Sequence, residues 1–193
     1  IQITRGVARR DHSFPKHSVA SLVMTVKHVS LDTGRQLAGK SAITVPDQRW
    51  DRRDIKTIQL LPNCLAKQAA SDKGAYEAIM VMPDGSVSEG SSSNVWILNN
   101  ENQLITRQPD EDILNGITRQ SIQRIAGERQ MEIVERPFSV DEMMQAKEVF
   151  VTSATSMVTA LTHIDGKEID EGKVGLIASA LKADYIEYVE ALS

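Results

Sequence analysis

The sequence predicts an α+β fold with many strands and few helices. Short runs rich in β-branched and aromatic residues alternate with turn sequences such as Pro83-Asp84-Gly85. Few segments repeat apolar residues at helical spacing, and the clearest runs from Val174 to Leu192. With 193 residues, 41% hydrophobic and 25% charged, the chain has ordinary globular composition. Its length suits one domain, or one domain plus a fragment of another.

The N-terminal part predicts two strands joined by a polar loop. Residues 1–5 alternate in character and predict a strand, residues 6–17 a loop, and residues 19–29 a second β-rich run. The triplet at 32–34, Asp-Thr-Gly, then interrupts the pattern as a linker does. The chain opens on an alternating run without an initiator Met, a pattern that fits a piece of a longer protein or ordinary processing of the N-terminus.

Strands and helices alternate from residue 41 onward. The patterns predict strands at 41–45, 76–82, 94–98, 103–106, 132–135 and 148–152, helices at 62–73, 118–131, 140–146 and 174–192, and a hairpin at 162–169. Pro62 and Gly74 are typical of the beginning and end of the first helix. Its apolar face is expected to carry Leu61, Leu65, Ala66 and Ala69. Thr118 is expected to cap the second helix.

Composition and failed motifs argue against several classes of function. A net charge of −4 without a basic block predicts no nucleic-acid partner. No apolar run reaches the length of a membrane span, and the single Cys64 excludes an internal disulfide, so we expect a cytoplasmic protein. The run from Gly34 to Ser41 matches a phosphate-binding loop, but a β-branched stretch and Pro46 follow it in place of the required helix. The histidines lack zinc spacing, so no metal site is predicted.

Five segments are polar or glycine-rich between apolar flanks. They lie at 10–12, 54–56, 88–94, 114–118 and 152–156. Partial burial of Lys56 among apolar neighbours would make its amine nucleophilic, although a solvent-exposed lysine is the commoner case. The run from Gly116 to Thr118 begins a helix whose free N–H groups could donate to a phosphate, although a plain cap is the commoner case. Taken one by one, these segments leave the function open.

In order, the segments form a more specific pattern. It reads ITRGVARRDHSFP at 3–15, RW at 49–50 with DIK at 54–56, EGSSSNV at 89–95, LNGITR at 114–119 and FVTS at 150–153. This pattern resembles the D-amino acid aminotransferases of the class IV, branched-chain-like group of pyridoxal phosphate enzymes. The resemblance covers essentially the whole chain.

The resemblance implies the class IV aminotransferase fold, with a small N-terminal α/β domain and a larger C-terminal cofactor-binding domain. Residues 1–31 then correspond to the last strands of the small domain, 32–35 to the interdomain linker and 36–193 to the domain that binds pyridoxal phosphate. The absent part would hold a phosphate-binding arginine and a tyrosine at the substrate carboxylate, so we expect this piece alone to bind cofactor poorly. The family also implies a homodimer.

The resemblance further implies pyridoxal 5'-phosphate as the cofactor. Its predicted binding residues are Lys56, Glu89, Ser92, Ser93, Leu114, Gly116, Ile117, Thr118, Ser153, Ala154 and Thr155. Lys56 is the predicted catalytic residue, which forms a Schiff base with the cofactor and then moves the substrate proton. Glu89 pairs with the pyridine nitrogen, the serines at 91–93 surround Glu89, and Leu114 packs on the ring.

Two further groups of residues follow from the same resemblance. Ile117 and Thr118 form one side of a phosphate cup, and residues 153–155 form the other. Ala154 stands where relatives often carry a hydroxyl, so any contact there would come from its backbone N–H. Arg10 and His12 match the pair that binds the substrate carboxylate.

The implied reaction is a ping-pong transfer of an amino group between a D-amino acid and a 2-oxo acid, of the D-alanine and 2-oxoglutarate type, through pyridoxamine phosphate. Branched-chain L-aminotransferase, aminodeoxychorismate lyase and (R)-selective amine transaminase share the fold and remain alternatives. The pattern from Arg10 to His12 argues against the first two. An inert cofactor-binding fragment is the alternative from another class. The side-chain specificity stays open.

Overall fold

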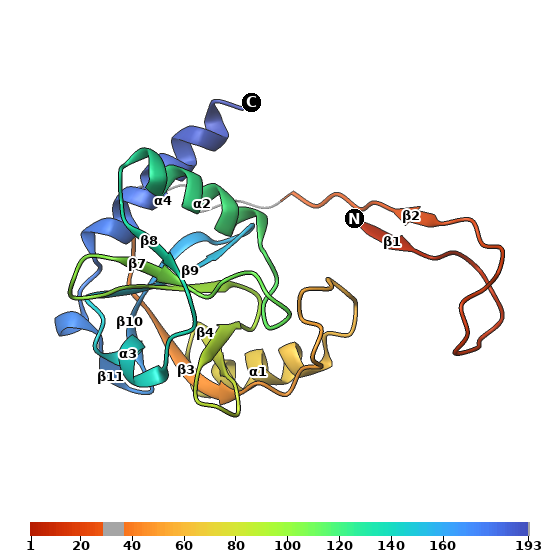
Figure 1. Cartoon of the computed structure of the whole chain (residues 1–193), viewed down its shortest axis with the longest axis horizontal. Helices are drawn as coiled ribbons and strands as arrows, with labels where there is room; N and C mark the ends of the chain where they lie inside the picture. Colours follow the sequence, from red (N-terminus) through yellow and green to blue (C-terminus); the bar gives the residue numbers. More distant parts are fainter. Residues whose placement is uncertain (29–36, 193) are drawn as a thin grey trace. The chain divides into compact units, whose positions relative to one another are not determined.

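A computed structural model describes residues 1–28 and 37–192 of the chain (Figure 1). The chain divides into two compact units, Ile1–Leu31 and Asp32–Ser193. The linker predicted at 32–35 lies outside the described residues.

The smaller unit is an antiparallel hairpin with a long loop. Strand β1 (Gln2–Thr4) pairs with β2 (Ser21–Val23). Both predicted strands are therefore confirmed in place, but the second covers only part of the β-rich run at 19–29. Gly6 has a φ of +109°, and a Cβ there would lie 2.0 Å from the carbonyl oxygen of Val19. The loop can close at this point only because residue 6 has no side chain.

The larger unit contains a mixed nine-stranded sheet and, among its described residues, four α-helices (Figure 1). The strands are β3 (Lys40–Pro46), β4 (Glu77–Val81), β5 (Val87–Gly90), β6 (Asn94–Leu98), β7 (Leu104–Thr106), β8 (Ile133–Glu135), β9 (Glu148–Ser153), β10 (Met157–Ile164) and β11 (Lys167–Glu168). The helices are α1 (Leu61–Asp72), α2 (Ile117–Glu128), α3 (Val140–Met144) and α4 (Leu176–Glu190), with a 3-10 turn at Asp170–Gly172. None of these helices is long and apolar enough to cross a membrane.

Most neighbouring strands of the sheet are antiparallel. The order is β5-β4-β3-β10-β9-β6-β7-β8, with β11 paired to β10. The pairs β3–β4, β3–β10 and β7–β8 are parallel. Strands that follow one another in the chain therefore lie far apart in the sheet in several places, and loops from distant parts of the sequence meet at its edges.

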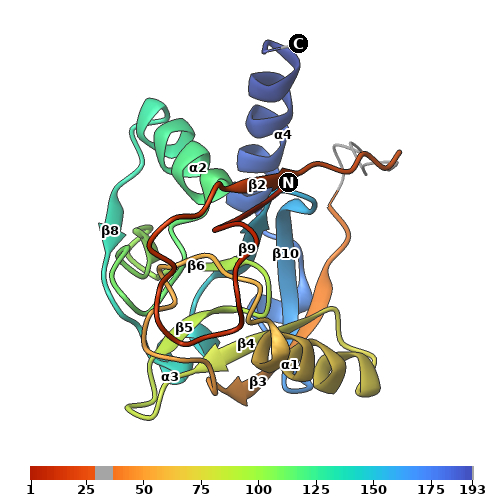
Figure 2. The same cartoon turned by 90° about the vertical axis from the view of Figure 1, so that its right-hand side faces the viewer.

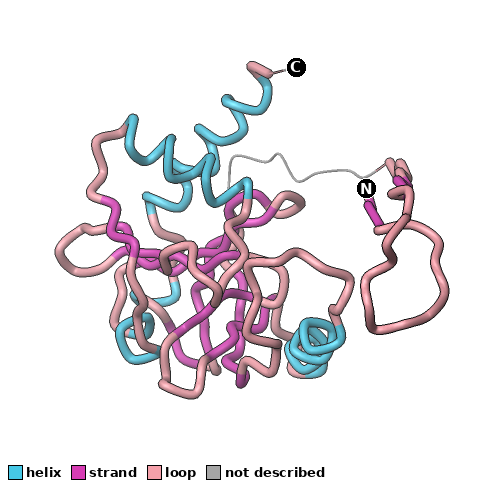
Figure 3. The backbone as a smooth tube through the Cα atoms, turned by 45° about the vertical axis from the view of Figure 1, so that its right-hand side comes forward, coloured by secondary structure: helices cyan, strands magenta, loops and turns pink. Residues whose placement is uncertain are grey.

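Alternating side chains along the strands face separate cores. In β6, Val95 and Ile97 belong to one core, whereas Trp96 belongs to another and stacks on Phe150 of β9 with ring centroids 5.9 Å apart. The core of Val95 includes side chains around α3, and that of Trp96 includes side chains of α2 and α4. Figures 2 and 3 show α2 and α4 together on one side of the strands and α1 on the other. This period-2 pattern is what identified the strands in the sequence.

The α+β prediction is confirmed, with two differences in the strands. Strand β5 was not predicted because its sequence, Val-Ser-Glu-Gly, has only one typical strand residue, although all four residues are buried. Strand β10 begins at Met157, five residues before the predicted hairpin at 162–169. The segment from Lys40 belongs to β3, so no helix follows the run that resembled a phosphate-binding loop.

Helix α1 differs from the prediction in the face that it buries. Leu61 and Leu65 are 70% and 55% exposed, whereas Ala66 and Ala70 are buried. The buried alanines pack with β3 and β4 side chains in a small third core. Because alanine allows a helix to approach a sheet closely, the small residues of α1 rather than its leucines face the sheet.

Candidate functional site

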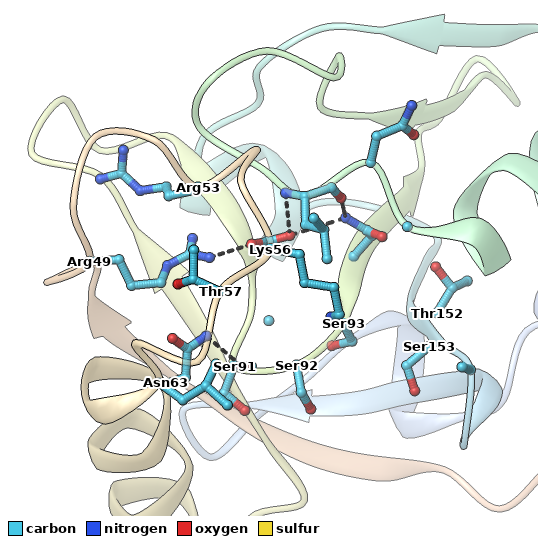
Figure 4. Close-up of a pocket in the computed structure, with 18 of the residues that line it drawn as sticks. Arg49, Arg53, Lys56, Thr57, Asn63, Ser91, Ser92, Ser93, Thr152 and Ser153 are labelled. Carbon is cyan, nitrogen blue, oxygen red and sulfur yellow. Dashed lines mark hydrogen bonds and ion pairs between the residues drawn. The ribbon is translucent and has the colours of Figure 1, made fainter. Parts of the chain in front are cut away.

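One cavity of about 770 Å³ in the larger unit is lined by the predicted cofactor residues (Figure 4). It lies where β5 ends, β6 begins and β9 ends, beside the first turn of α2. Antiparallel pairing of β6 with β9 places Asn94 opposite Thr152, and both line the cavity. Its walls include Lys56, Glu89, Ser92, Ser93, Leu114, Gly116, Ile117, Thr118, Ser153, Ala154 and Thr155.

Arg10 and His12 are not among the lining residues. Both belong to the smaller unit, and both are exposed there. Asp11 between them accepts a hydrogen bond at 2.7 Å from the backbone N–H of His12, which shapes the loop locally. The predicted carboxylate-binding pair and the predicted cofactor residues therefore come from different units of the chain.

Lys56 lies in an irregular segment between β3 and α1. The backbone N–H of Arg53 donates to the carbonyl of Glu111 at 2.9 Å, which ties this segment to the loop before α2. The Lys56 side chain extends into the cavity, with Ser92, Ser93 and Ser153 around it (Figure 4). Lys56 itself is exposed, as are its apolar neighbours Ile55 and Ile58, so the partial burial that these neighbours suggested is not found. Its amine nevertheless lines the cavity, where it can reach a bound molecule.

Glu89 is a carboxylate with both oxygens engaged. The residue is buried, and its Oε1 forms an ion pair with Arg49. Its Oε2 accepts hydrogen bonds from Asn94 Nδ2 at 3.2 Å and from the backbone N–H of Leu114 at 3.1 Å. Burial raises the pKa of Glu89 to about 7, although the neighbouring charge of Arg49 opposes this shift. The carboxylate is thus fixed in orientation, and it is partly ionised near neutral pH.

A buried network of charges supports this wall of the cavity. The Asp47 side chain is fully buried and accepts hydrogen bonds from Arg49 at 2.7 Å, Arg53 at 3.2 Å and the Ser88 hydroxyl at 2.7 Å. Burial acts to raise the pKa of Asp47, but the hydrogen bond and charge of Arg49 outweigh it and lower the pKa to about 2. Arg53 continues the network to Asp112 at 3.1 Å. The segment that leads to Lys56 is therefore held by paired charges.

Helix α2 presents its N-terminus to the cavity, but Thr118 is not its cap. Gly116 holds the N-cap position with extended backbone (φ −62°, ψ 141°) and forms no side-chain cap, whereas Thr118 is the second helical residue and is buried. The predicted cap was wrong because the helix already begins at Ile117. A Cβ at residue 116 would lie 2.4 Å from Asn94 Oδ1, so this position needs glycine. The first-turn N–H groups are left for an anion.

The turn after β9 forms another part of the wall. The hydroxyls of Ser153 and Ser156 lie 2.6 Å apart, and the backbone N–H of Ser156 donates to Ser153 Oγ at 3.2 Å. Ala154 contributes no hydroxyl, as its sequence position predicted. This turn and the first turn of α2 place hydroxyl and N–H donors on the same cavity, which suits a phosphate.

The serines after Glu89 do not surround it as predicted. The hydroxyls of Ser91 and Ser93 donate to Glu77 instead, and Ser92 is exposed on the cavity. The backbone N–H of Gly90 donates to the carbonyl of Ser93 at 2.7 Å, which closes a tight turn. Because of this turn, the two flanking hydroxyls reach the beginning of β4 rather than the carboxylate at the end of β5.

Sequence reasoning assigned no role to several of these side chains. Asp47, Arg53 and Asp112 belong to the charge network, and Glu77 holds the serine turn. The charges of both signs at 47, 49 and 53 were the available signal, but an exposed charged segment gives the same pattern. Only their burial distinguishes a network from a solvated surface.

Comparison with known proteins places this geometry in a family. Residues 1–164 match the model of the family described as amino-transferase class IV. The chain is 40% identical over 194 residues to a D-alanine aminotransferase of Staphylococcus aureus (strain N315), which covers all of this chain and 68% of that protein. It is 38% identical over 175 residues to a D-alanine aminotransferase of Bacillus licheniformis, which covers 91% of this chain and 61% of that protein.

A solved structure of an aminotransferase also resembles this chain. A branched-chain aminotransferase from the thermophilic archaeon Thermoproteus uzoniensis, solved with norvaline, is 26% identical, with a TM-score of 0.69 over 81% of this chain and 53% of that chain. The present chain thus spans about half the length of that structure and 68% of the Staphylococcus aureus relative. The family match over 1–164 and the identity to these relatives show that the chain belongs to the amino-transferase class IV family.

Proposed function

We propose that the protein uses pyridoxal 5'-phosphate to transfer an amino group from a D-amino acid to a 2-oxo acid. The single observation that carries this proposal is the cavity that gathers an amine, a buried carboxylate and a helix N-terminus from three distant segments. Class IV aminotransferases depend on this cofactor, and relatives 38–40% identical to this chain are named D-alanine aminotransferases.

The donor groups of the cavity fit this cofactor. Its volume of about 770 Å³ lies within the range of cofactor sites. The glycine at 116, where a Cβ would collide with Asn94, keeps the approach to the α2 N-terminus open for a phosphate. We infer that Ile117 and Thr118 bind the phosphate from this helix, and that residues 153–155 bind it from the opposite turn.

The remaining contacts follow from the same arrangement. When bound, pyridoxal phosphate supplies an electron sink for the carbanion that forms when the substrate loses its Cα proton. Lys56 would hold the cofactor covalently, and its Nζ, once released by substrate, would take up the proton from the substrate Cα and deliver it to C4′ of the cofactor. Glu89 binds the protonated ring nitrogen, and Leu114 orients the ring from one face. Both oxygens of Glu89 are already held by Arg49, Asn94 and Leu114, so the carboxylate is preorganised.

The substrate carboxylate needs a cation that is not otherwise paired. Both guanidinium groups of the cavity wall, Arg49 and Arg53, are paired with carboxylates of the chain. From the family pattern alone, we propose that Arg10 and His12 bind the substrate carboxylate. This assignment favours D-amino acids over the L-amino acids of branched-chain aminotransferases.

The larger assembly is also a proposal. We propose a homodimer in the cytoplasm, with residues 1–31 as part of a small domain and residues 36–193 as the cofactor domain. Exposed apolar side chains at the beginning of α1 support a homodimer, because an isolated unit would leave them in water. They are Ile58, Leu60, Leu61 and Leu65.

The proposed reaction is tested by turnover of alanine enantiomers. The purified protein, saturated with pyridoxal phosphate, is given D- or L-alanine with 2-oxoglutarate, and pyruvate is measured. We expect pyruvate from D-alanine only. Pyruvate from L-alanine alone would contradict the D-amino acid assignment, and pyruvate from neither would favour an inert cofactor-binding fragment or another reaction of the fold.

A further inference from the structure

A second buried carboxylate lies beside the cavity without lining it. Glu77, at the beginning of β4, is 2% exposed. Its Oε1 accepts hydrogen bonds from the Ser91 hydroxyl and from the backbone N–H of Ala78 at 2.9 Å, and its Oε2 accepts one from the Ser93 hydroxyl at 2.8 Å. Lys67 Nζ lies 3.6 Å from Oε1. A carboxylate is costly to bury, so these four contacts have to offset its desolvation.

These contacts hold a turn from several sides. The N–H of Gly90 donates to the carbonyl of Ser93 at 2.7 Å, and the N–H of Ser91 donates to the carbonyl of Ala78 at 2.9 Å. Asn63 Nδ2 donates to the carbonyl of Ser91 at 2.9 Å, a contact drawn in Figure 4. The turn has no spare room: a Cβ at residue 90 would lie 2.2 Å from Ser93 Oγ. The turn at 90–93 is therefore tied to β4 and to α1.

The turn joins two residues that meet in the cavity. Glu89 precedes it and Asn94 follows it, and their side chains share a hydrogen bond of 3.2 Å. Asn94 also donates to the carbonyl of Leu114 at 2.8 Å. Ser92, in the middle of the turn, faces the cavity. A shift of the turn would therefore change the spacing of Glu89, Asn94 and Leu114 together.

We propose that Glu77 is a positioning residue, which fixes the turn at 90–93 through Ser91 and Ser93 and thereby sets the placement of Glu89. The inference rests on the proposed function, in which Glu89 binds the ring nitrogen of the cofactor. Glu77 itself touches neither cofactor nor substrate. A glutamine at this position keeps the size of the side chain but has only one acceptor oxygen, so one serine hydroxyl loses its acceptor.

The test compares two buried glutamates in the holoenzyme. Glu77→Gln is matched with Glu148→Gln, because Glu148 is also buried and accepts two backbone N–H bonds, from Ile177 and Ala178 of α4, away from the cavity. The readouts are kcat, KM and the pH midpoint of the absorption band of bound pyridoxal phosphate. For Glu77→Gln we expect a kcat at least about tenfold lower and a shifted midpoint. For Glu148→Gln we expect a lower Tm with kcat and midpoint unchanged.

A double-mutant cycle tests the route through the serines. If Glu77 acts through them, Glu77→Gln has less than about a twofold further effect on kcat in a Ser91→Ala, Ser93→Ala background. Independent, multiplying effects would overturn the proposal, as would a Glu77→Gln enzyme with the wild-type kcat and midpoint. Should Glu77→Gln fail to fold, Ser93→Ala alone carries the test through the same two readouts. A wild-type protein with no cofactor band would instead overturn the proposed function itself.

Discussion

Arg49 and Glu89 form an ion pair in the wall of the cavity, and each side chain is only 8% exposed. Two opposing effects act on the pKa of this carboxylate. Burial raises the pKa of Glu89 to about 7, and the charge of Arg49 opposes that rise. The protonation of the group proposed to bind the ring nitrogen therefore depends on a neighbouring arginine.

Replacing Arg49 weakens cofactor binding. Arg49→Gln removes the cation, so the pKa of Glu89 rises further and its charged form becomes rarer at neutral pH. We expect about 10- to 100-fold weaker binding of pyridoxal phosphate, measured by absorbance titration. Arg52→Gln is the control, because Arg52 is half-exposed and pairs with Asp54 at the surface. Equal affinity of wild type and Arg49→Gln would contradict the role of the pair.

The stability of the cofactor-free protein depends on pH through Glu89. Its folded-state pKa of about 7 lies above the ordinary 4.5, so the folded state binds more protons between these values. Stability then falls as pH rises from 4.5 to 7, and Glu89→Gln removes this decline. Urea unfolding at several pH values measures it, with exposed Glu101→Gln as the control. Parallel curves for wild type and Glu89→Gln would rule out the shift.

Asp47 acts in the opposite direction at lower pH. Its folded-state pKa of about 2 lies below the ordinary 3.8. Its contribution to stability is therefore complete above pH 3.8 and is lost as pH falls through 2. Asp47→Asn should be less stable than wild type at pH 5, with the difference shrinking towards pH 2. A difference that is independent of pH would show that the charge of Asp47 is not responsible.

The bond between Arg53 and Asp112 ties the Lys56 segment to the loop that carries Leu114. Asp112→Asn weakens the contact to Arg53 at 3.1 Å and the ion pair with Arg107. Because Asp112 is partly exposed, we expect a loss of about 1–3 kcal/mol in unfolding free energy and weaker cofactor binding. Glu111→Gln is a neighbouring control, since its side chain is 71% exposed. Equal losses in the two variants would show that the tie has no special effect.

Two glycines, one at the N-cap of α4 and one within α2, should respond oppositely to alanine. A Cβ at Gly175 would lie 1.8 Å from Cδ of Glu148, which caps α4 through two backbone N–H groups. Gly175→Ala should cost about 1–3 kcal/mol because it displaces this cap. A Cβ at Gly127 in α2 meets nothing within 4 Å, so Gly127→Ala should gain up to about 1 kcal/mol. Thermal unfolding measures both, and a stable Gly175→Ala protein would contradict the capping role.

Local patterns in the sequence predicted the elements that depend on the spacing of apolar residues and on turn or cap residues. The side chains around Trp96 alternate between two cores, and Pro62 lies at the beginning of α1. The motif residues, from Lys56 to the turn at 153–155, could be found because their order along the chain resembles a known family. All of those predicted to bind cofactor line one cavity.

Other features depend on contacts between distant segments. Glu77 lies 14 and 16 residues from the serines that it binds, and no periodicity links them. Strand β5 is buried despite its polar sequence, because neighbouring strands and side chains satisfy its serine and glutamate. Leu61 is exposed because the smaller Ala66 fits against the sheet. Such outcomes depend on tertiary packing, which single-sequence patterns do not contain.

In the proposed function, Lys56 is the amine that holds the cofactor. The direct measurement is borohydride reduction of the protein in the presence of pyridoxal phosphate, followed by peptide mass mapping. We expect a phosphopyridoxyl group on Lys56 that Lys56→Ala abolishes and that Lys173→Ala, at an exposed position, leaves in place. A label absent from Lys56, or spread over exposed lysines and unaffected by Lys56→Ala, would contradict it.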